Sequence, residues 1–363
     1  MASCISEELD SFILRLKCLE AGEVIPMDKQ LFSYTIRVIS AVAFCTLPDR
    51  AHNYFFGSDV IDDIHDLFAF MLHRTLFRLP EWMWRLSPQY ATEIKGRRAN
   101  TRFTSYSEEV VRNARVAFES DGKINDGRIY RKSLIEGLLG AEESSDVPMT
   151  DEEVVANVKI FFLAGSDTTS VTITWCLYQL CIDEALQREV QREVDRVLGD
   201  DMTGADAVAA VPLLPLCTAL FKETLRLRGP VDDIALEVTG KETVVLSNGL
   251  ELQPGDEVFV HSQSIMSDPA LFLDPHTFDA HRWLSDSQCP ERLRNMEAAF
   301  LAFGGGPRLC PGRALAAFEG VAAVIGIVGT FEMRLGCPVE EIKRVDAFVM
   351  KANKMPIVLK RRI

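Results

Sequence analysis

The chain has 363 residues, 47% of them hydrophobic, which is enough to bury one large core. Its 53 acidic and 39 basic side chains give a formal net charge of -14, so a polyanion such as nucleic acid is disfavoured as a partner. The nine cysteines are odd in number and scattered, which favours free thiols in a reducing compartment over a disulfide framework.

Helical spacing of apolar residues dominates the first part of the chain. It runs from Glu7 to about Asn100 and continues to Gly140, where a loose polar stretch begins. No segment reaches the ~20 apolar residues of a membrane-spanning helix, and Met1 to Asp10 lacks the regions of a signal peptide. We therefore expect a single domain over residues 1–363, with no membrane anchor in this chain.

A long helix is predicted in the middle of the chain. The segment Thr150-Asp151-Glu152-Glu153 has the pattern of a capping box and opens an apolar stretch that runs to about Ile182. A shorter, charged helix follows from Asp183 to Gly199. A third runs from about Leu213 to Arg228 and ends there because Pro230 disfavours helical geometry in the residue before it.

Short strands are predicted after the third of these helices. The predicted later elements are strands at Thr243–Leu246 and Glu257–Val260, a helix over about Pro311–Gly329, and strands near Val345–Val349 and Ile357–Leu359. The predicted fold class is therefore mainly α with a small β-sheet.

The segment Phe303–Gly312, FGGGPRLCPG, carries the strongest chemical signal. It places Cys310 at the start of a helix, where backbone donors and the helix dipole favour a thiolate. Gly306 and Gly312 permit a flat cofactor to approach the backbone, and Arg308 can reach a carboxylate. The Gly-Lys-Ser/Thr ending of a phosphate loop and the flanking ligands of a zinc site are both absent. An inert buried cysteine stays an alternative.

A second signal lies within the long helix, in Ala164-Gly165-Ser166-Asp167-Thr168-Thr169. Glycine costs a helix roughly 1 kcal/mol relative to alanine, and threonine hydroxyls can bond to a carbonyl one turn back. We expect a local break in the helix. A patch of small residues where another helix packs closely is an equally good interpretation.

A third signal is the pair Glu223 and Arg226, three residues apart on one helical face. On these residues alone, a solvated surface pair is the usual outcome.

The segment Phe303–Gly312 resembles the haem-ligand signature of the cytochrome P450 superfamily, Phe-x-x-Gly-x-Arg-x-Cys-x-Gly, at every fixed position. The resemblance implies haem b as the cofactor, with Cys310 as the axial ligand of the iron. It also implies that Arg308 pairs with a haem propionate and that Phe303 packs on the sulfur side.

The segment from Ala164 to Thr169 is similar to the family's Ala/Gly-Gly-x-Asp/Glu-Thr-Thr element, in which a distorted helix crosses the haem. This implies that Ala164 and Gly165 lie against the cofactor, that Thr168 holds dioxygen and its water by hydrogen bonds, and that Asp167 relays protons from solvent.

The pair Glu223-x-x-Arg226 resembles a family pair that is buried behind the cysteine loop and tied to a later arginine. Phe278–Trp283 supplies that arginine as Arg282, although Ala280 stands where proline is usual. The resemblance implies that these three charged residues support the haem loop and take no part in the chemistry.

The function implied by the resemblance is a haem-thiolate monooxygenase that inserts one oxygen atom into an apolar substrate. Its electrons would come from NADPH through a reductase, which would dock near Arg308 and Arg313. Three short segments are similar to the fatty-acid omega-hydroxylase group, and three apolar residues are expected either to line the substrate site or to belong only to the core. These are Asp28-x-Gln30, Asn248-Gly249 and Pro254-Gly255, and Phe161, Phe162 and Val171.

The chain departs from the family pattern at two places. Met27 to Phe44 resembles a helix that follows an anchor, the first strands, the substrate roof and a helix with a haem-binding Trp and Arg, and we find none of these before it. Leu236 stands where a haem-contacting arginine or histidine is usual. We thus expect a P450 fold lacking its anchor, first strands and early helices, with a full-length form at the cytosolic face of the endoplasmic reticulum.

Two alternatives to a monooxygenase follow. One is a non-catalytic haem-binding fragment, the product of a truncated or wrongly assembled gene. The other is a haem-thiolate isomerase or lyase that rearranges peroxides, which is disfavoured because the proton-relay pair Asp167 and Thr168 is present.

Overall fold

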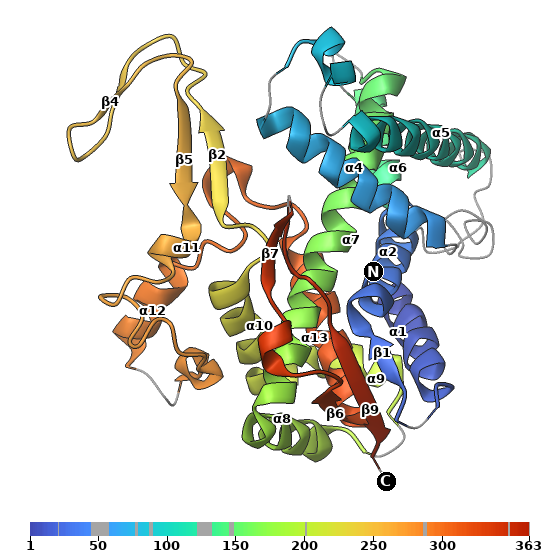
Figure 1. Ribbon diagram of the computed structural model, residues 1–363, viewed down its shortest axis with the longest axis vertical. Coiled ribbons are helices and arrows are strands. Elements are labelled where there is room, and N and C mark those ends of the chain that lie inside the picture. Colours follow the sequence, from blue (N-terminus) through green and yellow to red (C-terminus); the bar gives the residue numbers. More distant parts are fainter. Residues whose placement is uncertain are drawn as a thin grey trace.

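Helices make up most of the described chain. The computed structural model describes residues 1–20, 22–44, 58–76, 79–86, 90–121, 133–144, 149–199, 202–285, 289–347 and 349–362. The α-helices are α1 (Ala2–Lys17), α2 (Met27–Phe44), α4 (Ser58–Leu76), α5 (Tyr90–Asp121), α6 (Leu134–Ser144), α7 (Asp151–Ile182), α8 (Glu184–Val197), α9 (Gly204–Ala210), α10 (Pro215–Arg228), α11 (Ser262–Ile265), α12 (Pro290–Ala298) and α13 (Arg313–Thr330). Short 3-10 helices are η1 (Glu81–Leu86), η2 (Val211–Leu213), η3 (Ala280–Trp283), η5 (Gly306–Arg308) and η6 (Val339–Glu341). The predicted mainly α class is confirmed (Figure 1).

The strands are short and all pair antiparallel. They are β1 (Val24–Pro26), β2 (Asp233–Glu237), β3 (Val244–Val245), β4 (Glu251–Leu252), β5 (Glu257–His261), β6 (Phe331–Leu335), β7 (Arg344–Ala347), β8 (Val349–Ala352) and β9 (Pro356–Arg361). Within the described ranges they form one three-stranded sheet, β1-β9-β6, and the pairs β2-β5, β3-β4 and β7-β8. The predicted small sheet is thus present and is accompanied by three separate pairs of strands that are close in sequence.

The long helix α7 runs through the centre of the molecule (Figure 1). Its capping box is present, with the Glu153 amide donating to the Thr150 hydroxyl at 3.3 Å and the Thr150 amide donating to the Glu153 carboxylate at 2.7 Å. Its C-terminal half is buried almost all round, and α7 packs against α2, α5, α10 and α13. Residues on α7 can therefore reach several sides of the core.

The break expected within α7 is not observed, and the helix is continuous from Asp151 to Ile182. The hydroxyls of Ser166 and Thr168 do bond to carbonyls one turn back, at 2.6 and 2.7 Å, as expected. These bonds are added to the backbone ladder without replacing it. The Thr35 hydroxyl of α2 also donates to the Ser166 carbonyl at 2.9 Å, which ties the two helices together at this point.

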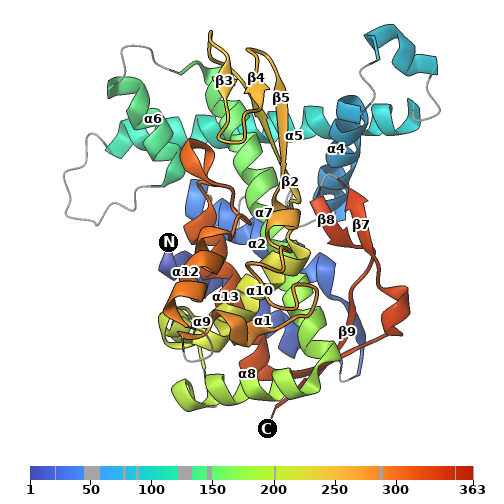
Figure 2. The same ribbon diagram turned by 90° about the vertical axis from the view of Figure 1, so that its left-hand side faces the viewer.

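Two clusters of buried side chains share α7. One joins its C-terminal half to α1, α10, α13, β6 and β9, and the other joins its N-terminal half to α2, α4 and α5. Helix α5 crosses this N-terminal half (Figure 2). Leu315, near the start of α13, packs against both clusters.

Helix α13 is the one described helix that is by itself long and apolar enough to cross a membrane, and a bent pair, Gly204–Leu213 with Pro215–Arg228, passes the same test when taken together. Residues Glu319–Val328 of α13 are nevertheless buried in the core. Their apolar character is therefore accounted for by packing.

Candidate active site

The cysteine loop, Phe303–Gly312, is a tight turn that leads directly into α13. The Cys310 amide donates to the Phe303 carbonyl at 2.9 Å, which closes the loop, and the Ala316 amide donates to the Gly312 carbonyl at 2.8 Å, which begins the helix. Gly304 and Gly306 have φ angles of 74° and 64°. L side chains rarely adopt this left-handed conformation, so glycine is needed at both positions.

The same loop presents an open face. A Cβ placed on Gly306 would meet no atom within 4 Å, and one on Gly312 would lie 3.8 Å from the Cys310 sulfur. Cys310 is half-buried, whereas Arg308 is exposed and forms no ion pair with any residue in the described ranges. The thiol and the guanidinium are both accessible to a ligand that covers the loop.

Glu223, Arg226 and Arg282 are brought together in the core. Glu223 and Arg226 are fully buried, and two nitrogens of Arg226 donate to the two carboxylate oxygens at 2.8 and 2.9 Å. Arg282 Nε and the indole nitrogen of Trp283 each donate to the carboxylate at 2.9 Å. The remaining guanidinium nitrogens of the two arginines donate to backbone carbonyls of Met266 and of the loop after α11. The bond from Arg226 to the Met266 carbonyl is 2.8 Å long. The surface pair expected from these residues alone is thus ruled out.

Aromatic rings connect this buried network to the cysteine loop. The Trp283 ring meets the Phe300 ring edge to face, with centroids 5.3 Å apart, and Phe300 meets Phe303 in the same way at 6.5 Å. Lys222 Nζ lies 4.9 Å from the Trp283 ring centroid. Since Phe303 also accepts the Cys310 amide, the network can hold the loop in place through these rings.

Helix α7 has an exposed stripe between buried side chains. Ala164 is exposed and Ile160, one turn earlier, is 51% exposed, although the neighbouring Phe162 and Leu163 are buried. The Thr168 hydroxyl lies on this side and donates to the Ala164 carbonyl at 2.7 Å. An exposed stripe on an otherwise buried helix is a surface that a large ligand can cover.

Gly165 lies on a different side of α7. A Cβ there would be 3.0 Å from both Cδ1 and Cγ1 of Ile39 on α2. This close contact is the one that the alternative interpretation of the segment predicted. Small size at Gly165 therefore lets α2 approach, whereas Ala164 is the residue that faces the open side.

Asp167 is 3% exposed, and its Oδ2 has no hydrogen-bond partner in the described part of the protein. Burial raises the pKa of this carboxyl, and the positive charge of Lys351 opposes that shift. Consecutive helical residues point about 100° apart, so Asp167 and Thr168 face different sides of α7. The structure does not bring the two side chains together.

The residues expected to line an apolar substrate site belong mostly to the core. Phe162 is fully buried, with its ring centroid 4.3 Å from that of Phe44 and 6.0 Å from that of Phe103, and Val171 is also buried. Phe162 packs on all sides and so does not reach a ligand, whereas Val171 lines a cavity of about 270 Å³ beside α7. Phe161 is half-buried.

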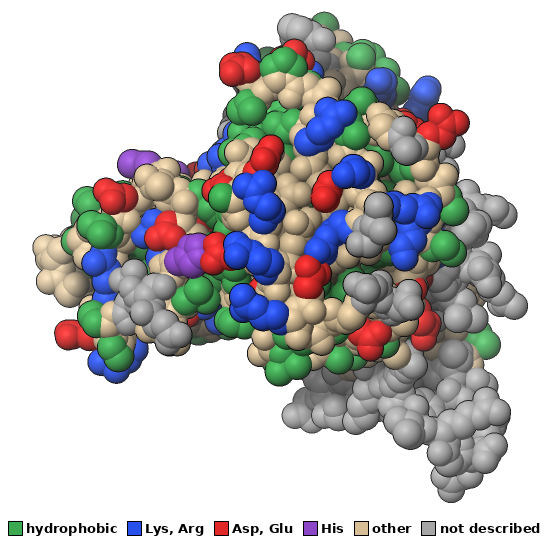
Figure 3. Space-filling model, turned by 90° about the horizontal axis from the view of Figure 1, so that it is seen from below, with side chains coloured by type: hydrophobic (Ala, Val, Ile, Leu, Met, Phe, Trp, Pro, Cys, Tyr) green, Lys and Arg blue, Asp and Glu red, His purple; other side chains and the backbone are tan. Residues whose placement is uncertain are grey.

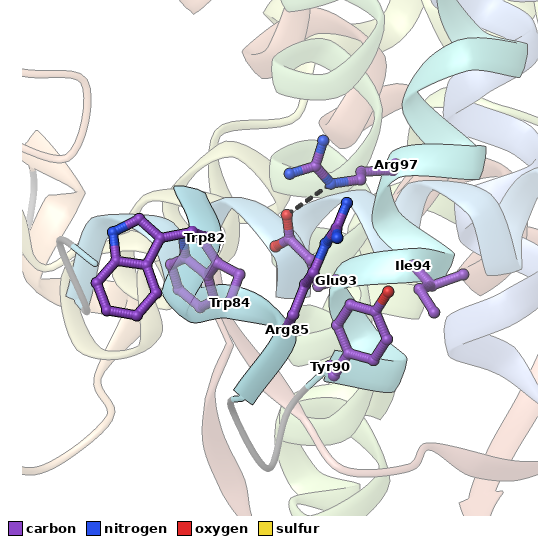
Figure 4. A pocket seen from close by; sticks show the side chains of 7 residues that line it. All are labelled: Trp82, Trp84, Arg85, Tyr90, Glu93, Ile94 and Arg97. Atoms are coloured by element: carbon purple, nitrogen blue, oxygen red, sulfur yellow. Dashed lines mark hydrogen bonds and ion pairs between the residues drawn. The ribbon is translucent and has the colours of Figure 1, made fainter. Parts of the chain in front are cut away.

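A separate cavity of about 600 Å³ lies between η1 and α5 (Figure 4). Its lining residues are Trp82, Trp84, Arg85, Tyr90, Glu93, Ile94 and Arg97. Glu93 accepts from Arg97 at 2.8 Å and also pairs with Arg74, so its carboxylate is already neutralised. None of the predicted site residues lines this cavity.

Sequence reasoning missed the roles of Trp283, Phe300 and Lys351. Trp283 directly follows Arg282, so its position beside the network was open to prediction. Nothing in the pattern around Phe300 marks its ring contacts with Trp283 and Phe303, and Lys351 acts on Asp167, which is far away in sequence.

Comparison with known proteins places this site in context. A family model described as Cytochrome P450 matches residues 1–358. The chain is 27% identical to the mitochondrial sterol 26-hydroxylase of Oryctolagus cuniculus, over 96% of this chain and 64% of that protein. It is 35% identical to the probable cytochrome P450 6a13 of Drosophila melanogaster, over 51% of this chain and 36% of that protein. It is 33% identical to the cyclooctatin synthase of Streptomyces melanosporofaciens, over 56% of this chain and 42% of that protein. In alignments with these three and five other curated relatives, the chain spans between 28% and 64% of the relative's own length.

Proposed function

This chain belongs to the cytochrome P450 family, and on that premise we propose that it is a haem-thiolate monooxygenase acting on an apolar substrate. The observation that carries the proposal is the open cysteine loop at the start of α13, joined by aromatic rings to the buried Glu223 network. When bound, haem b supplies the activation of dioxygen, and thiolate ligation favours cleavage of the O–O bond.

The residues of the cysteine loop suit a flat, anionic iron cofactor. Cys310 would be the iron ligand, since its thiol is accessible in the loop that leads into α13. The open space beside Gly306 admits the edge of a planar ring. Arg308, which is exposed, would bind a propionate carboxylate.

Thr168 would accept a hydrogen bond from a water molecule at the open face of α7. Its own proton goes to the Ala164 carbonyl, so the lone pairs of Oγ1 are available to accept from a water molecule on the open side. Asp167, whose carboxyl pKa is raised by burial, would pass protons from solvent.

The proposed substrate is an apolar molecule, with fatty acids as the first class to test. Ile160 provides exposed apolar surface one turn from Ala164, on the same side of α7. Hydrocarbon is bound there by burial of apolar surface, without the need for an ion pair. The resemblance of Asp28-x-Gln30 and Asn248-Gly249 to omega-hydroxylases supports the choice of fatty acids.

Electrons are proposed to come from NADPH through a reductase that docks at the cysteine loop. Arg308 and Arg313 are exposed there and offer positive charge to an acidic partner. The proposed location is the cytosolic face of the endoplasmic reticulum. Fractionation of cells tests this, because recovery with mitochondria would contradict it.

The experiment that tests the function follows labelled oxygen. Protein loaded with haem b and supplied with NADPH and a reductase is given fatty acids and sterols under isotope-labelled dioxygen. We expect a substrate-induced change of spin state and a product with one labelled oxygen atom. Cys310→Ala should abolish both, whereas Cys289→Ala, at an exposed cysteine outside the site, should keep both. Haem binding without labelled product from any of these compounds would contradict the proposal and favour the non-catalytic alternative.

A further inference from the structure

The cavity of about 600 Å³ between η1 and α5 has aromatic walls (Figure 4). Trp82 and Trp84 line it from η1, and Tyr90 lines it from the first residue of α5. Trp82 is 66% exposed and Tyr90 is 40% exposed, whereas Trp84 is buried. Two of the three rings are therefore open to a ligand that enters from solvent.

The exposure of Trp82 is the unusual feature of this cavity. A tryptophan left mostly in water forgoes the free energy that burial of its large apolar ring would give. An apolar side chain exposed by itself needs no explanation, but this indole stands with a second indole and a phenol around one cavity. Aromatic walls with a few polar groups are typical of a small-molecule site.

The buried wall of the cavity is held in place by charged groups. Glu93 is 3% exposed, accepts from Arg97 at 2.8 Å and also pairs with Arg74 of α4. The Arg74 guanidinium lies 5.4 Å from the centroid of the Trp84 ring. These contacts join η1 to α4 and α5, so this wall is formed before a ligand binds.

Positive charge is in excess at the cavity. The single carboxylate of Glu93 is shared by the guanidinium groups of Arg74 and Arg97. Arg85 of η1 lies among the residues that surround the cavity (Figure 4), and it is exposed. It forms no ion pair with any residue in the ranges that the structure describes. Its guanidinium group is thus free to bind a carboxylate or a sulfonate through two parallel hydrogen bonds.

We propose that this cavity binds a small aromatic anion, a flat ring system that carries one carboxylate or sulfonate group. Arg85 binds the anionic group, and Trp82 stacks on the ring system. The volume lies within the range of ~300–1,000 Å³ that small-molecule sites have. The inference does not depend on the proposed monooxygenase function, because none of the residues assigned to the haem site lines the cavity.

Equilibrium dialysis of the haem-loaded protein with naphthoate tests the site, and quenching of tryptophan fluorescence locates it. We expect naphthoate to bind and Arg85→Met to weaken binding by ~10-fold or more, because a charge-assisted pair of hydrogen bonds is lost. Trp82→Leu should weaken binding and reduce the quenching. Both replaced side chains are exposed, so both variants should fold as the wild type does.

Arg98→Met is the matched control, since Arg98 is exposed on α5 but does not line the cavity. It should keep the affinity of the wild type. Absence of naphthoate binding, an unchanged affinity in Arg85→Met, or an equal loss in Arg98→Met would overturn the assignment of the site.

Two further compounds test the class of ligand. Naphthamide keeps the rings without the charge, and decanoate keeps the charge without a ring. Each should bind at least ~10-fold more weakly than naphthoate, because each lacks one of the two interactions. Naphthamide or decanoate bound as tightly as naphthoate would overturn the proposal of an aromatic anion.

Discussion

At the scale of single residues, Glu223 is the acidic partner of the two buried arginines Arg226 and Arg282. It accepts hydrogen bonds from Arg226, Arg282, Trp283 and the Asp279 amide, with distances from 2.8 to 3.1 Å. Removing a partner from such a cluster leaves positive charge buried without compensation.

We expect Glu223→Gln to destabilise the fold by ~3–5 kcal/mol, measured by urea unfolding. The matched control is Glu184→Gln in the exposed helical pair Glu184 and Arg188, where the N–O distance is 3.2 Å. That change should cost no more than ~0.5 kcal/mol, because exposed pairs contribute little. Equal losses for the two variants would contradict a supporting role for the buried network.

Glu319 of α13 makes stability depend on pH. It is fully buried, and burial raises the pKa of its carboxyl well above the usual range. The folded state thus holds this proton more tightly than the unfolded state does. Stability is therefore greatest below the unfolded pKa and falls as pH rises from there toward the folded pKa.

Glu319→Gln should remove this dependence. We expect the variant to lose less stability than the wild type between about pH 5 and about pH 8 in urea unfolding. Glu340→Gln, at an exposed position on η6, should follow the wild type. Parallel pH profiles for Glu319→Gln and the wild type would show that Glu319 is not protonated in the folded protein.

At the scale of elements, the contact between α10 and α13 depends on Gly320. A Cβ there would lie 2.3 Å from a ring carbon of the buried Phe221. Gly137 on α6 is the opposite case, because its Cβ would meet no atom within 4 Å.

Substitution by alanine at these two glycines should change the stability of the protein in opposite directions. Gly320→Ala should destabilise the protein by ~1–3 kcal/mol through overpacking, although alanine is the better helix former. Gly137→Ala should stabilise it by up to ~1 kcal/mol through helix propensity alone. Urea unfolding measures both, and stabilisation by Gly320→Ala would show that α10 and α13 do not pack this closely.

Local signals decided which elements could be predicted. Helices α7, α8 and α10 lie close to where the sequence predicts them. Thr150 caps the start of α7, Asp183 caps the start of α8, and Gly229 follows the last residue of α10. Strands β1, β2 and β6 were not predicted, since short strands carry little periodic pattern and β6 directly follows the apolar residues of α13. The continuity of α7 could not be foreseen either, because Thr35 of α2 helps to hold its weakest part.

At the scale of the whole molecule, the formal charge of -14 does not say where acidic and basic side chains lie on the surface. The face at the lower end of Figure 1 carries many basic side chains interspersed with acidic ones (Figure 3). Helix α8 and the C-terminus lie at this end of the molecule (Figure 1), and ion pairs join Arg188 to Glu184 within α8 and Arg362 to Asp195 of α8, at 3.2 and 2.6 Å. Composition alone does not predict such a distribution, because it depends on which helices lie side by side.

The assembly of the site also depends on the whole fold. Cys310, Glu223 and Arg282 lie far apart in sequence, and the family signature predicted their association without showing how it is achieved. The aromatic connection through Phe300 and the side of α7 that Asp167 faces come only from the three-dimensional packing.

The central claim is that Cys310 binds the haem iron as a thiolate, and the carbon monoxide difference spectrum of the reduced, haem-loaded protein tests it most directly. We expect the long-wavelength band typical of thiolate ligation in the wild type and in Cys289→Ala, and its loss in Cys310→Ala. A wild-type protein without this band, or a Cys310→Ala variant that keeps it, would contradict the account.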